Sequence, residues 1–291
     1  MPELPEVETV KNGLKQLIVG KTIQSVTFDT AKSFPNKKED VSRYLIGSSV
    51  VSVIRRAKVI IIELDSKYSL LVHLKMTGQL VYKDKSVRFG AGHPNDSLIG
   101  KLPDKSTRVV LSFKQGGKLF FNDQRKFGWI KLIATAEIPN VDFFKKIGPD
   151  ALAGDMTWQK FRERLLRRPR SGIKAVLLDQ SIIAGLGSIY TDEVLWASRI
   201  HPSQPAADLS SRKIHELYDN IVAILRLAIA KGGSTDRNYV DAEGKKGSYL
   251  KYAKVFRLNG TPCQRCGTAI IKIRVAGRGT HICPSCQRIG G

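Results

Sequence analysis

The four cysteines of this chain form two closely spaced pairs near its end. Cys263 and Cys266 lie in CQRC, and Cys283 and Cys286 lie in CPSC after sixteen intervening residues. Each C-x2-C pair lets two thiolates reach one tetrahedral ion, and the segments between the pairs are typical of a β-hairpin. Cysteine fills all four ligand positions, so the pattern predicts one structural Zn²⁺ rather than a catalytic ion.

Two alternatives to this zinc site stay open at the level of sequence. In the first alternative, the cysteine pairs are redox-active or unligated thiols. In the second, His281 is a competing ligand. We favour zinc because a reducing compartment keeps thiols reduced and available to a metal. For His281 we favour a hydrogen-bonded residue of the hairpin.

The first nine residues, MPELPEVET, combine a proline at position two with three acidic side chains. Removal of Met1 exposes the secondary amine of Pro2, a nucleophile that can condense with a sugar carbonyl carbon. An α-amino group has a pKa of about 8, so a useful fraction is neutral at physiological pH. Glu3 is placed to move a proton and Glu6 to hold the amine. The alternative is an ordinary acidic helix start that retains Met1.

The charge balance of the chain is strongly basic. Forty-eight Lys and Arg residues against 26 Asp and Glu give a net charge of +22. Such an excess favours a polyanionic partner, because each neutralised phosphate releases condensed counterions. Charge alone leaves a ribosomal or a membrane-surface protein open. The start has no signal-peptide pattern, and the apolar run 221–230 is too short to span a bilayer. We therefore expect a cytoplasmic protein without a membrane partner.

Hydrophobic periodicity divides the chain into a strand-rich and a helix-rich part. Apolar residues at helical spacing predict a helix over residues 7–18, and residues 22–133 are strand-like around a long polar loop at 84–105. Helical patterns follow from residue 156. The fold class is therefore α+β, with an N-terminal β-sandwich flanked by a helix and a C-terminal helical domain that carries a zinc-finger hairpin. We expect a sandwich over 1–134, a linker over 135–150, a helical domain over 151–235, a mobile polar segment over 236–258 and the finger over 259–291.

Seven motifs together resemble one known family. PELPEVET, RRAKVIIIEL, HLKMTGQL, GHP, FNDQRKFG, DQSIIAGLGSIYTDEVLW and the final GRGTHICPSCQ occur in this order over nearly the full length. They resemble the bacterial formamidopyrimidine-DNA glycosylases, which excise oxidised purines such as 8-oxoguanine. The resemblance implies a bifunctional glycosylase and AP lyase of base excision repair, which acts in association with the nucleoid on double-stranded DNA with damaged bases or abasic sites. The sequence offers no sign of an oligomer interface, so we expect a monomer. It also implies a helix–two-turn–helix domain and a lesion-recognition loop at 236–258.

The resemblance implies catalytic roles for five residues. Pro2 would attack C1′ of the damaged nucleotide and form an imine, with Glu3 as general acid and Glu6 beside it. Lys58 would assist β-elimination and touch the lesion phosphate, although it is also compatible with an ordinary hairpin lysine. Arg278 would clamp a flanking phosphate and serve in δ-elimination. Its phosphate contact is the firmer expectation, because an arginine with a pKa of about 13 is a poor proton donor.

The resemblance also implies a set of DNA contacts. An enzyme that acts on a base takes it out of the stack, and an apolar wedge with a cation can fill the hole. Met76, Arg125 and Phe127 match the family's wedge, although apolar residues in strands usually belong to a core. The other expected DNA contacts are His73, His93, Arg170, Lys174, Ser188 and Lys272.

Two positions depart from the family's pattern. Ser188 stands where the family usually has Asn, and Phe256 stands where it often has Tyr. Gly185 and Gly187 let backbone amides approach a phosphate at a helix N-terminus. Both departures shorten or delete a phosphate hydrogen bond, so we expect weaker DNA binding with the chemistry intact.

Three alternative functions stay open. A sister enzyme resembling endonuclease VIII would prefer oxidised pyrimidines on the same scaffold. A non-catalytic DNA-binding relative would keep the fold and the finger but not the chemistry. An RNA-binding zinc-ribbon protein would explain the charge but not the N-terminus.

Overall fold

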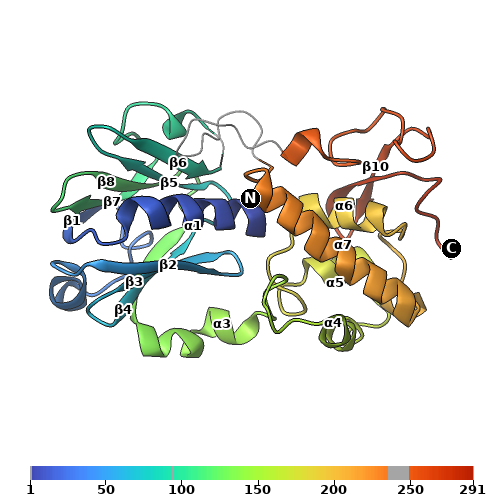
Figure 1. The fold of residues 1–291 in the computed structure, drawn as a ribbon, viewed down its shortest axis with the longest axis horizontal. Coiled ribbons are helices and arrows are strands. Elements are labelled where there is room, and N and C mark those ends of the chain that lie inside the picture. The colour runs from blue at the N-terminus through green and yellow to red at the C-terminus, as the bar shows by residue number, and fades with distance from the viewer. Residues whose placement is uncertain (1, 94, 235–248, 291) are drawn as a thin grey trace. The chain divides into compact units, whose positions relative to one another are not determined.

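The structure is a computed structural model that describes residues 2–93, 95–234 and 249–290. The described residues divide into two compact units (Figure 1). The first unit comprises residues up to 145 together with residues 231–234, and the second comprises residues 146–230 and those from 249 onward. Each unit has its own sheet or hairpin and its own helices.

Two antiparallel sheets form the first unit. The five-stranded sheet has the order β1-β7-β8-β5-β6, and the four-stranded sheet has the order β2-β3-β4-β9. The strands of the first sheet are β1 (Ile23–Phe28), β5 (Gly78–Lys83), β6 (Arg88–Gly92), β7 (Thr107–Phe113) and β8 (Lys118–Asp123). Those of the second are β2 (Val50–Arg56), β3 (Val59–Leu64), β4 (Tyr68–His73) and β9 (Trp129–Ala134). Five short helices accompany them: α2 (Lys38–Asp40), η1 (Val41–Leu45), η2 (Asp96–Leu98), η3 (Thr135–Asn140) and α3 (Asp142–Lys146).

The N-terminal helix α1 (Leu4–Ile18) contacts strands of both sheets. Val10 and Leu14 of this helix belong to one apolar cluster with Val72 of β4 and Phe121 of β8. Apolar residues that recur with period 3.6 along α1 therefore pack in one core with apolar residues that alternate along the strands. The predicted β-sandwich with a flanking N-terminal helix is confirmed.

A reciprocal capping box fixes the first turn of α1. The Glu6 carboxylate accepts a hydrogen bond from the backbone N–H of Glu3 at 2.8 Å, and the Glu3 carboxylate accepts one from the backbone of Glu6. Pro5 occupies the first turn, where its missing N–H costs nothing. The acidic residues that mark the start of the sequence thus also define the start of the helix.

The predicted loop over residues 84–105 is wrong in part. Residues Arg88–Gly92 form strand β6, which pairs with β5 in the register Gln79↔Gly92 to Lys83↔Arg88. The segment RFGAG has a weak strand signal because glycine and alanine have low β-propensity. Pairing with β5 decides its conformation, and that pairing is a tertiary interaction.

The second unit contains four helices and a hairpin among its main elements. Helix α7 (Ser211–Ala230) packs against α4 (Trp158–Leu165) and α6 (Ser188–Ala197), and α6 also contacts α5 (Ile173–Leu178). Strands β10 (Ile271–Val275) and β11 (Arg278–Ile282) form the antiparallel hairpin. Two single turns, η4 (Ala206–Asp208) and η5 (Tyr249–Lys251), complete the unit. The predicted helices and the predicted finger hairpin are confirmed.

Two further expectations concern single segments. Of the mobile segment expected at 236–258, residues 236–248 lie outside the described residues. From Tyr249 onward the chain is described and begins with η5. A search of the described helices for one long and apolar enough to cross a membrane finds none.

We predict that Gly13→Val destabilises the first unit. A Cβ at Gly13 would lie 2.2 Å from Cζ of Phe89, a buried ring of the core. Overpacking of this kind costs about 1–3 kcal/mol. Gly154→Val is the control, because a Cβ there meets nothing within 4 Å. Urea unfolding should show a lower midpoint for Gly13→Val alone, and equal midpoints would contradict the close packing of α1.

Candidate functional site

The N-terminal end of α1 is buried and held by one carboxylate. Pro2, Glu3 and Glu6 are all buried. Besides the bond from Glu3, the Glu6 carboxylate accepts hydrogen bonds from the backbone N–H of Ser234 at 2.7 Å and from its hydroxyl at 2.9 Å. The residue at 233 is glycine with φ +84°, and a Cβ there would lie 2.9 Å from Glu6 Oε1. Glycine is therefore required for the chain at 233–234 to approach this carboxylate so closely.

Lys58 and His73 lie close together at one end of the four-stranded sheet. Lys58 is buried and follows Ala57, whose φ of +53° makes the tight turn between β2 and β3. The next residue, Val59, pairs directly with His73 of β4. The β3–β4 register thus brings a lysine and a histidine that are fifteen positions apart in the sequence to the same end of the sheet.

His73 is held as a neutral imidazole. Its Nδ1 accepts a hydrogen bond from the backbone N–H of Lys75 at 3.0 Å, which leaves Nε2 as the donor. Burial, followed by the charges of Lys75 and Lys58, lowers the pKa of His73 to about 3. At physiological pH this residue can therefore donate a hydrogen bond to a phosphate without carrying a charge.

The three residues expected to form the wedge cluster on the surface of the first unit. The Arg125 Nη1 lies 3.1 Å from the sulfur of Met76, and the guanidinium lies 4.9 Å from the centre of the Phe127 ring. Met76 and Phe127 are 42% and 44% exposed, so neither is a core residue. An exposed apolar pair with a cation is the arrangement that an inserted wedge requires.

Buried Gln79 supports the predicted DNA contact His93. Its amide nitrogen donates to the backbone oxygen of His93 and to the side-chain oxygen of Asn95, the latter at 2.7 Å. Burial lowers the pKa of His93 as well. The sequence analysis did not single out Gln79, because its role depends on β5 lying next to β6.

Four clustered cysteine sulfurs in the second unit fit one zinc ion. The Sγ atoms of Cys263, Cys266, Cys283 and Cys286 all lie within 4.8 Å of one another. A tetrahedral Zn²⁺ with Zn–S bonds of about 2.3 Å requires sulfurs about 3.8 Å apart. The indole N–H of Trp196 donates to the sulfur of Cys263 at 3.4 Å, and such outer hydrogen bonds orient metal ligands. The ion would join the turn at residues 263–266 to the turn at residues 283–286 and would have no open position for substrate.

The position of Lys174 contradicts its expected contact with DNA. Its ammonium is fully buried and lies 2.5 Å from Asp192 Oδ1 and 2.7 Å from the hydroxyl of Thr280. A buried ammonium that is already paired cannot also reach a DNA phosphate, so Lys174 is a residue that joins α5, α6 and β11. The sequence pattern could not separate a buried lysine from an exposed one.

The second carboxylate oxygen of Asp192 holds His281 in place. Asp192 Oδ2 accepts from the backbone N–H of His281 at 2.9 Å and lies 3.3 Å from its Nδ1. The ring is not part of the cluster of four sulfurs. The favoured prediction, a hydrogen-bonded hairpin histidine, is confirmed.

Glu193 is an organising residue that the sequence analysis missed. Its carboxylate accepts three backbone hydrogen bonds of 2.8–3.0 Å from Lys254, Val255 and Phe256. Burial raises the pKa of Glu193, while these hydrogen bonds act in the opposite direction. The signal was present in the sequence as an adjacent acid pair inside an otherwise apolar helix. The ring of Phe256, which departs from the family's pattern, packs edge-on against His281.

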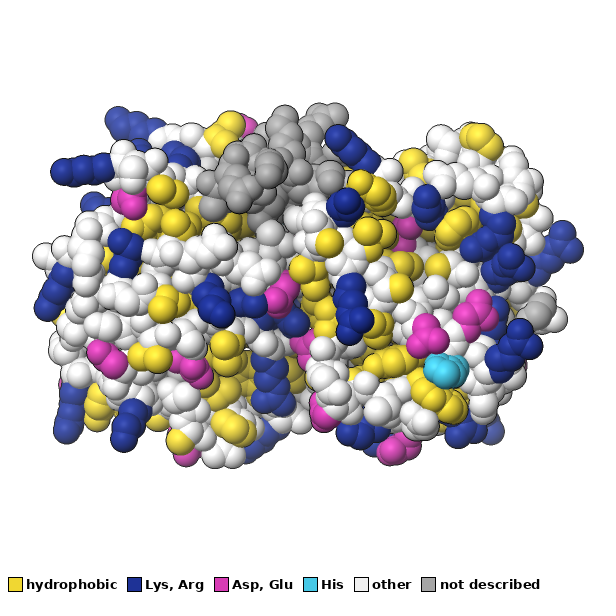
Figure 2. Space-filling view, viewed as in Figure 1, with side chains coloured by type: hydrophobic (Ala, Val, Ile, Leu, Met, Phe, Trp, Pro, Cys, Tyr) yellow, Lys and Arg dark blue, Asp and Glu magenta, His cyan; other side chains and the backbone are white. Residues whose placement is uncertain are grey.

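The remaining predicted DNA contacts of the second unit are accessible. Arg170, Lys272 and Arg278 are exposed, and Ser188 is half-buried as the first residue of α6. Gln180 shapes the loop before α6 by accepting from the backbone N–H of Gly185 at 3.0 Å. Figure 2 shows Lys and Arg side chains spread over the visible face of the molecule.

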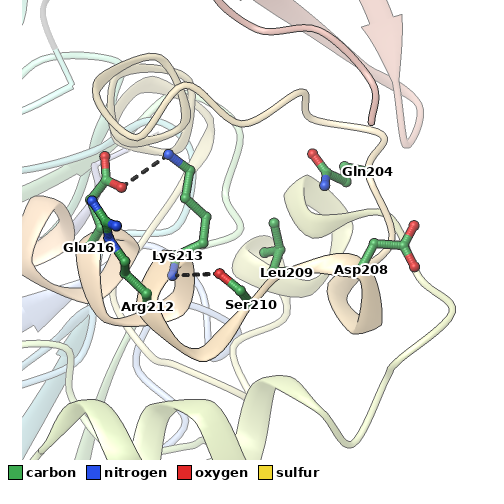
Figure 3. Close-up of a pocket in the computed structure, with 7 residues that line it drawn as sticks. All are labelled: Gln204, Asp208, Leu209, Ser210, Arg212, Lys213 and Glu216. Atoms are coloured by element: carbon green, nitrogen blue, oxygen red, sulfur yellow. Dashed lines mark hydrogen bonds and ion pairs between the residues drawn. The ribbon is translucent and has the colours of Figure 1, made fainter. Parts of the chain in front are cut away.

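A separate pocket of about 410 Å³ lies at the N-terminal end of α7 (Figure 3). Figure 3 shows Lys213 turned toward Glu216, 3.0 Å from its carboxylate, and Ser210 capping the helix. The lining mixes both charges and contains none of the predicted site residues. It consists of Gln204, Asp208, Leu209, Ser210, Arg212, Lys213 and Glu216.

We predict that Lys174→Met lowers the free energy of unfolding by about 3–5 kcal/mol, because it leaves a buried carboxylate without its cation. Lys160→Met is the matched control, since Lys160 lies 3.6 Å from Asp155 and both side chains are more than half exposed. That surface pair should contribute about 0–1 kcal/mol. Urea unfolding of both variants gives the comparison, and equal losses would contradict a dominant role for the buried pair.

Comparisons with known proteins agree with this geometry. Three family descriptions match in order: "Formamidopyrimidine-DNA glycosylase N-terminal domain" over residues 1–130, "Formamidopyrimidine-DNA glycosylase H2TH domain" over 147–239, and "Zinc finger found in FPG and IleRS" over 260–289. The formamidopyrimidine-DNA glycosylase of Latilactobacillus sakei subsp. sakei (strain 23K) is 38% identical, with 99% of this chain and 98% of that protein covered. That of Streptococcus pyogenes serotype M6 is 40% identical, with 99% of each covered.

Solved structures of the same family share the fold. A Lactococcus lactis FPG mutant in complex with Fapy-dG containing DNA has a TM-score of 0.86 at 37% identity, with 99% of this chain and 100% of that chain covered. MutM in complex with carbocyclic 8-oxo-G containing DNA has a TM-score of 0.85 at 38% identity and the same coverage. The resemblance seen in the motifs is confirmed. This chain therefore belongs to the formamidopyrimidine-DNA glycosylase family and is a DNA repair glycosylase with a four-cysteine zinc finger.

Proposed function

We propose that this enzyme excises 8-oxoguanine and formamidopyrimidines from duplex DNA and then cleaves the strand at the resulting abasic site. The observation that carries the proposal is the buried N-terminal end of α1, where Glu6 holds residue 3 in place directly beside Pro2. Once Met1 is removed, the amine at this buried position next to a carboxylic acid is suited to imine formation at a sugar carbon. Among the relatives, Lactococcus lactis Fpg is known in complex with DNA containing an abasic site.

The proposed chemistry begins at Pro2. Its nitrogen bonds to C1′ of the damaged nucleotide, and the base leaves with the electron pair of the glycosidic bond. Glu3 supplies the proton needed as the base departs. The proline nitrogen then loses its proton, and the C1′–O4′ bond breaks with O4′ taking up a proton, which leaves an iminium ion between the nitrogen and C1′. Removal of a C2′ proton then expels the 3′ phosphate, and a second elimination expels the 5′ phosphate.

Lys58, His73 and Arg278 hold the DNA backbone in this proposal. Lys58 is the cation next to the lesion phosphate and assists the first elimination, and His73 donates its Nε2–H to the same phosphate region. Arg278 is exposed on β11 and clamps a flanking phosphate. It acts by charge and bidentate hydrogen bonding rather than as an acid.

The predicted division of labour along the chain belongs to the same proposal. Residues 1–134 carry the catalytic groups, and residues 135–150 link them to the helical domain. Residues 151–235 and 259–291 bind the DNA, and residues 236–258 recognise the damaged base. We also propose that the enzyme works in the cytoplasm on the nucleoid, where chromosomal DNA presents its lesions.

We predict that borohydride traps a covalent adduct between the protein and an 8-oxoguanine:cytosine duplex only when Pro2 is the N-terminal residue. A form that retains Met1 should give no adduct, because its Pro2 nitrogen is an amide and cannot form an imine. Pro2→Gly tests the need for proline at this position. The adduct is measured by gel electrophoresis of labelled DNA.

Lys58→Met distinguishes the two amines that could be trapped. If Pro2 is the nucleophile, this variant still forms the adduct, while its strand cleavage is slower. Loss of the adduct in Lys58→Met together with its persistence in the Met1-retaining form would contradict the proposal. DNA binding by every form is checked in parallel, so that a failure to bind is not read as a failure of chemistry.

We predict that Ser188→Asn tightens binding to a duplex containing a tetrahydrofuran abasic analogue by about tenfold. The longer amide reaches further from the start of α6, and a hydrogen bond to a charged group contributes about 1.5–3 kcal/mol. Ser211→Asn is the control, because Ser211 is the first residue of α7 and is exposed. An unchanged or weaker dissociation constant for Ser188→Asn at matched salt would show that Ser188 does not limit binding.

A further inference from the structure

Asp123 lies buried beneath the three wedge residues Met76, Arg125 and Phe127. It is the last residue of β8 and is 1% exposed. In the β5–β8 pair it stands opposite Gly78, two residues beyond Met76. The sheet register therefore places this carboxylate between the turn that carries Met76 and the loop that carries Arg125 and Phe127.

The carboxylate of Asp123 uses each oxygen for a different task. Its Oδ1 accepts from the hydroxyl of Thr77 and from the backbone N–H of Arg125, the latter at 3.2 Å. Its Oδ2 accepts from the backbone N–H groups of Phe127 at 2.8 Å and of Gly128 at 2.7 Å. One side chain thus fixes the loop at both ends and ties it to the neighbouring turn.

The conformation of this loop is one that the local sequence does not favour. Lys126, at its tip, has φ +57°, which is an unusual region for a residue with a side chain. At Gly128 a Cβ would lie 2.6 Å from the ring of Phe121 and 2.9 Å from the backbone oxygen of His73. The hydrogen bonds to Asp123 compensate for this strained path.

The backbone contacts of Asp123 determine where the wedge side chains project. With the loop fixed, the Arg125 guanidinium reaches both the Met76 sulfur and the Phe127 ring, while the two apolar side chains stay exposed. Apolar side chains on a free loop would instead be expected to fold back onto the protein surface. We infer that Asp123 is a positioning residue that holds the Met76–Arg125–Phe127 wedge ready to enter DNA.

This inference rests on the proposed function, and it separates two steps of the reaction. Removal of 8-oxoguanine from a duplex requires the base to leave the stack, and the wedge assists that step. Cleavage at an abasic site that already lacks its base requires the Pro2 amine but has no base to displace. A defect in the wedge should therefore slow the first reaction much more than the second.

Asp123→Asn tests the inference with nearly the same side-chain shape. The four groups that face the carboxylate are all donors, and an amide replaces one acceptor oxygen by a donor. Whichever way the amide is turned, it breaks the bonds on one side and leaves polar groups unpaired. Asp84→Asn is the matched control, because Asp84 accepts from Ser86 and Val87 backbone N–H groups and from the Tyr82 hydroxyl in a turn at the other end of β5.

Thr77 offers a second pair of variants that leaves the Asp123 side chain itself unchanged. Thr77→Ser keeps the hydroxyl that donates to Asp123 Oδ1 and accepts from the backbone N–H of Arg125 at 3.1 Å, whereas Thr77→Val removes it at nearly constant volume. Rescue by serine would show that the hydrogen bond, rather than the bulk of the side chain, matters. This pair decides the question if Asp123→Asn does not fold.

The readouts are single-turnover excision from an 8-oxoguanine:cytosine duplex, strand cleavage at a preformed abasic site, and fluorescence of 2-aminopurine placed next to the lesion. For Asp123→Asn and Thr77→Val we expect excision and the fluorescence rise to slow by about tenfold or more, with cleavage at the abasic site changed by less than about threefold. Asp84→Asn and Thr77→Ser should behave as the unmodified protein.

Two results would overturn the inference. One is excision by folded Asp123→Asn or Thr77→Val at the rate of the controls. The other is an equal loss at the lesion and at the abasic site, which would mean a general structural role. Failure of the unmodified protein to excise 8-oxoguanine would instead reject the proposed substrate, and the abasic-site and fluorescence arms keep that outcome separate.

Discussion

The hydrogen bonds of the Glu6 carboxylate are the interaction on which the candidate site depends. They connect the backbone of Glu3, beside the proposed nucleophile, to Ser234, more than two hundred positions later. A carboxylate that accepts several hydrogen bonds of 2.7–2.9 Å in a buried position is held in one orientation. The start of α1 and the end of the 231–234 segment are consequently fixed with respect to each other. The catalytic role that we propose for Pro2 rests on this arrangement.

Buried acids recur as organisers in this otherwise basic protein. Asp123 shapes the wedge loop, Asp192 pairs with Lys174 and His281, and Glu193 binds the backbone at residues 254–256. Each accepts hydrogen bonds from groups that are distant along the chain or from a loop that bears exposed functional side chains. These acids are hidden from solvent, whereas Lys and Arg side chains cover the visible surface of the molecule. Within a chain of net charge +22, these few buried acids therefore act as acceptors for backbone and side-chain donors.

The sequence was most informative where a local pattern carries its own chemistry. Helix α1, the helices of the second unit and the hairpin with its four cysteines follow from periodicity, capping residues and ligand spacing. It was least informative where long-range pairing decides, as for β6, whose glycine-rich segment has little strand propensity of its own. Lys174 failed as a predicted DNA contact for the same reason, because residue type does not reveal burial. Gln79, Asp123 and Glu193 lie inside the family motifs, but nothing local in the sequence separates their structural roles from those of the neighbouring motif residues.

By itself the sequence determined the class of chemistry. A proline at position two among glutamates, a C-x2-C pair repeated after sixteen residues, and an excess of cations predict a nucleophile, a metal and a polyanionic partner. The tertiary structure decided which side chains face solvent and which organise the others. It buried Lys174 on Asp192, exposed Met76 and Phe127, and placed Asp123 beneath them. The physical reason is that burial and hydrogen-bond partnership arise from strand register and packing between distant segments, and no local pattern encodes these.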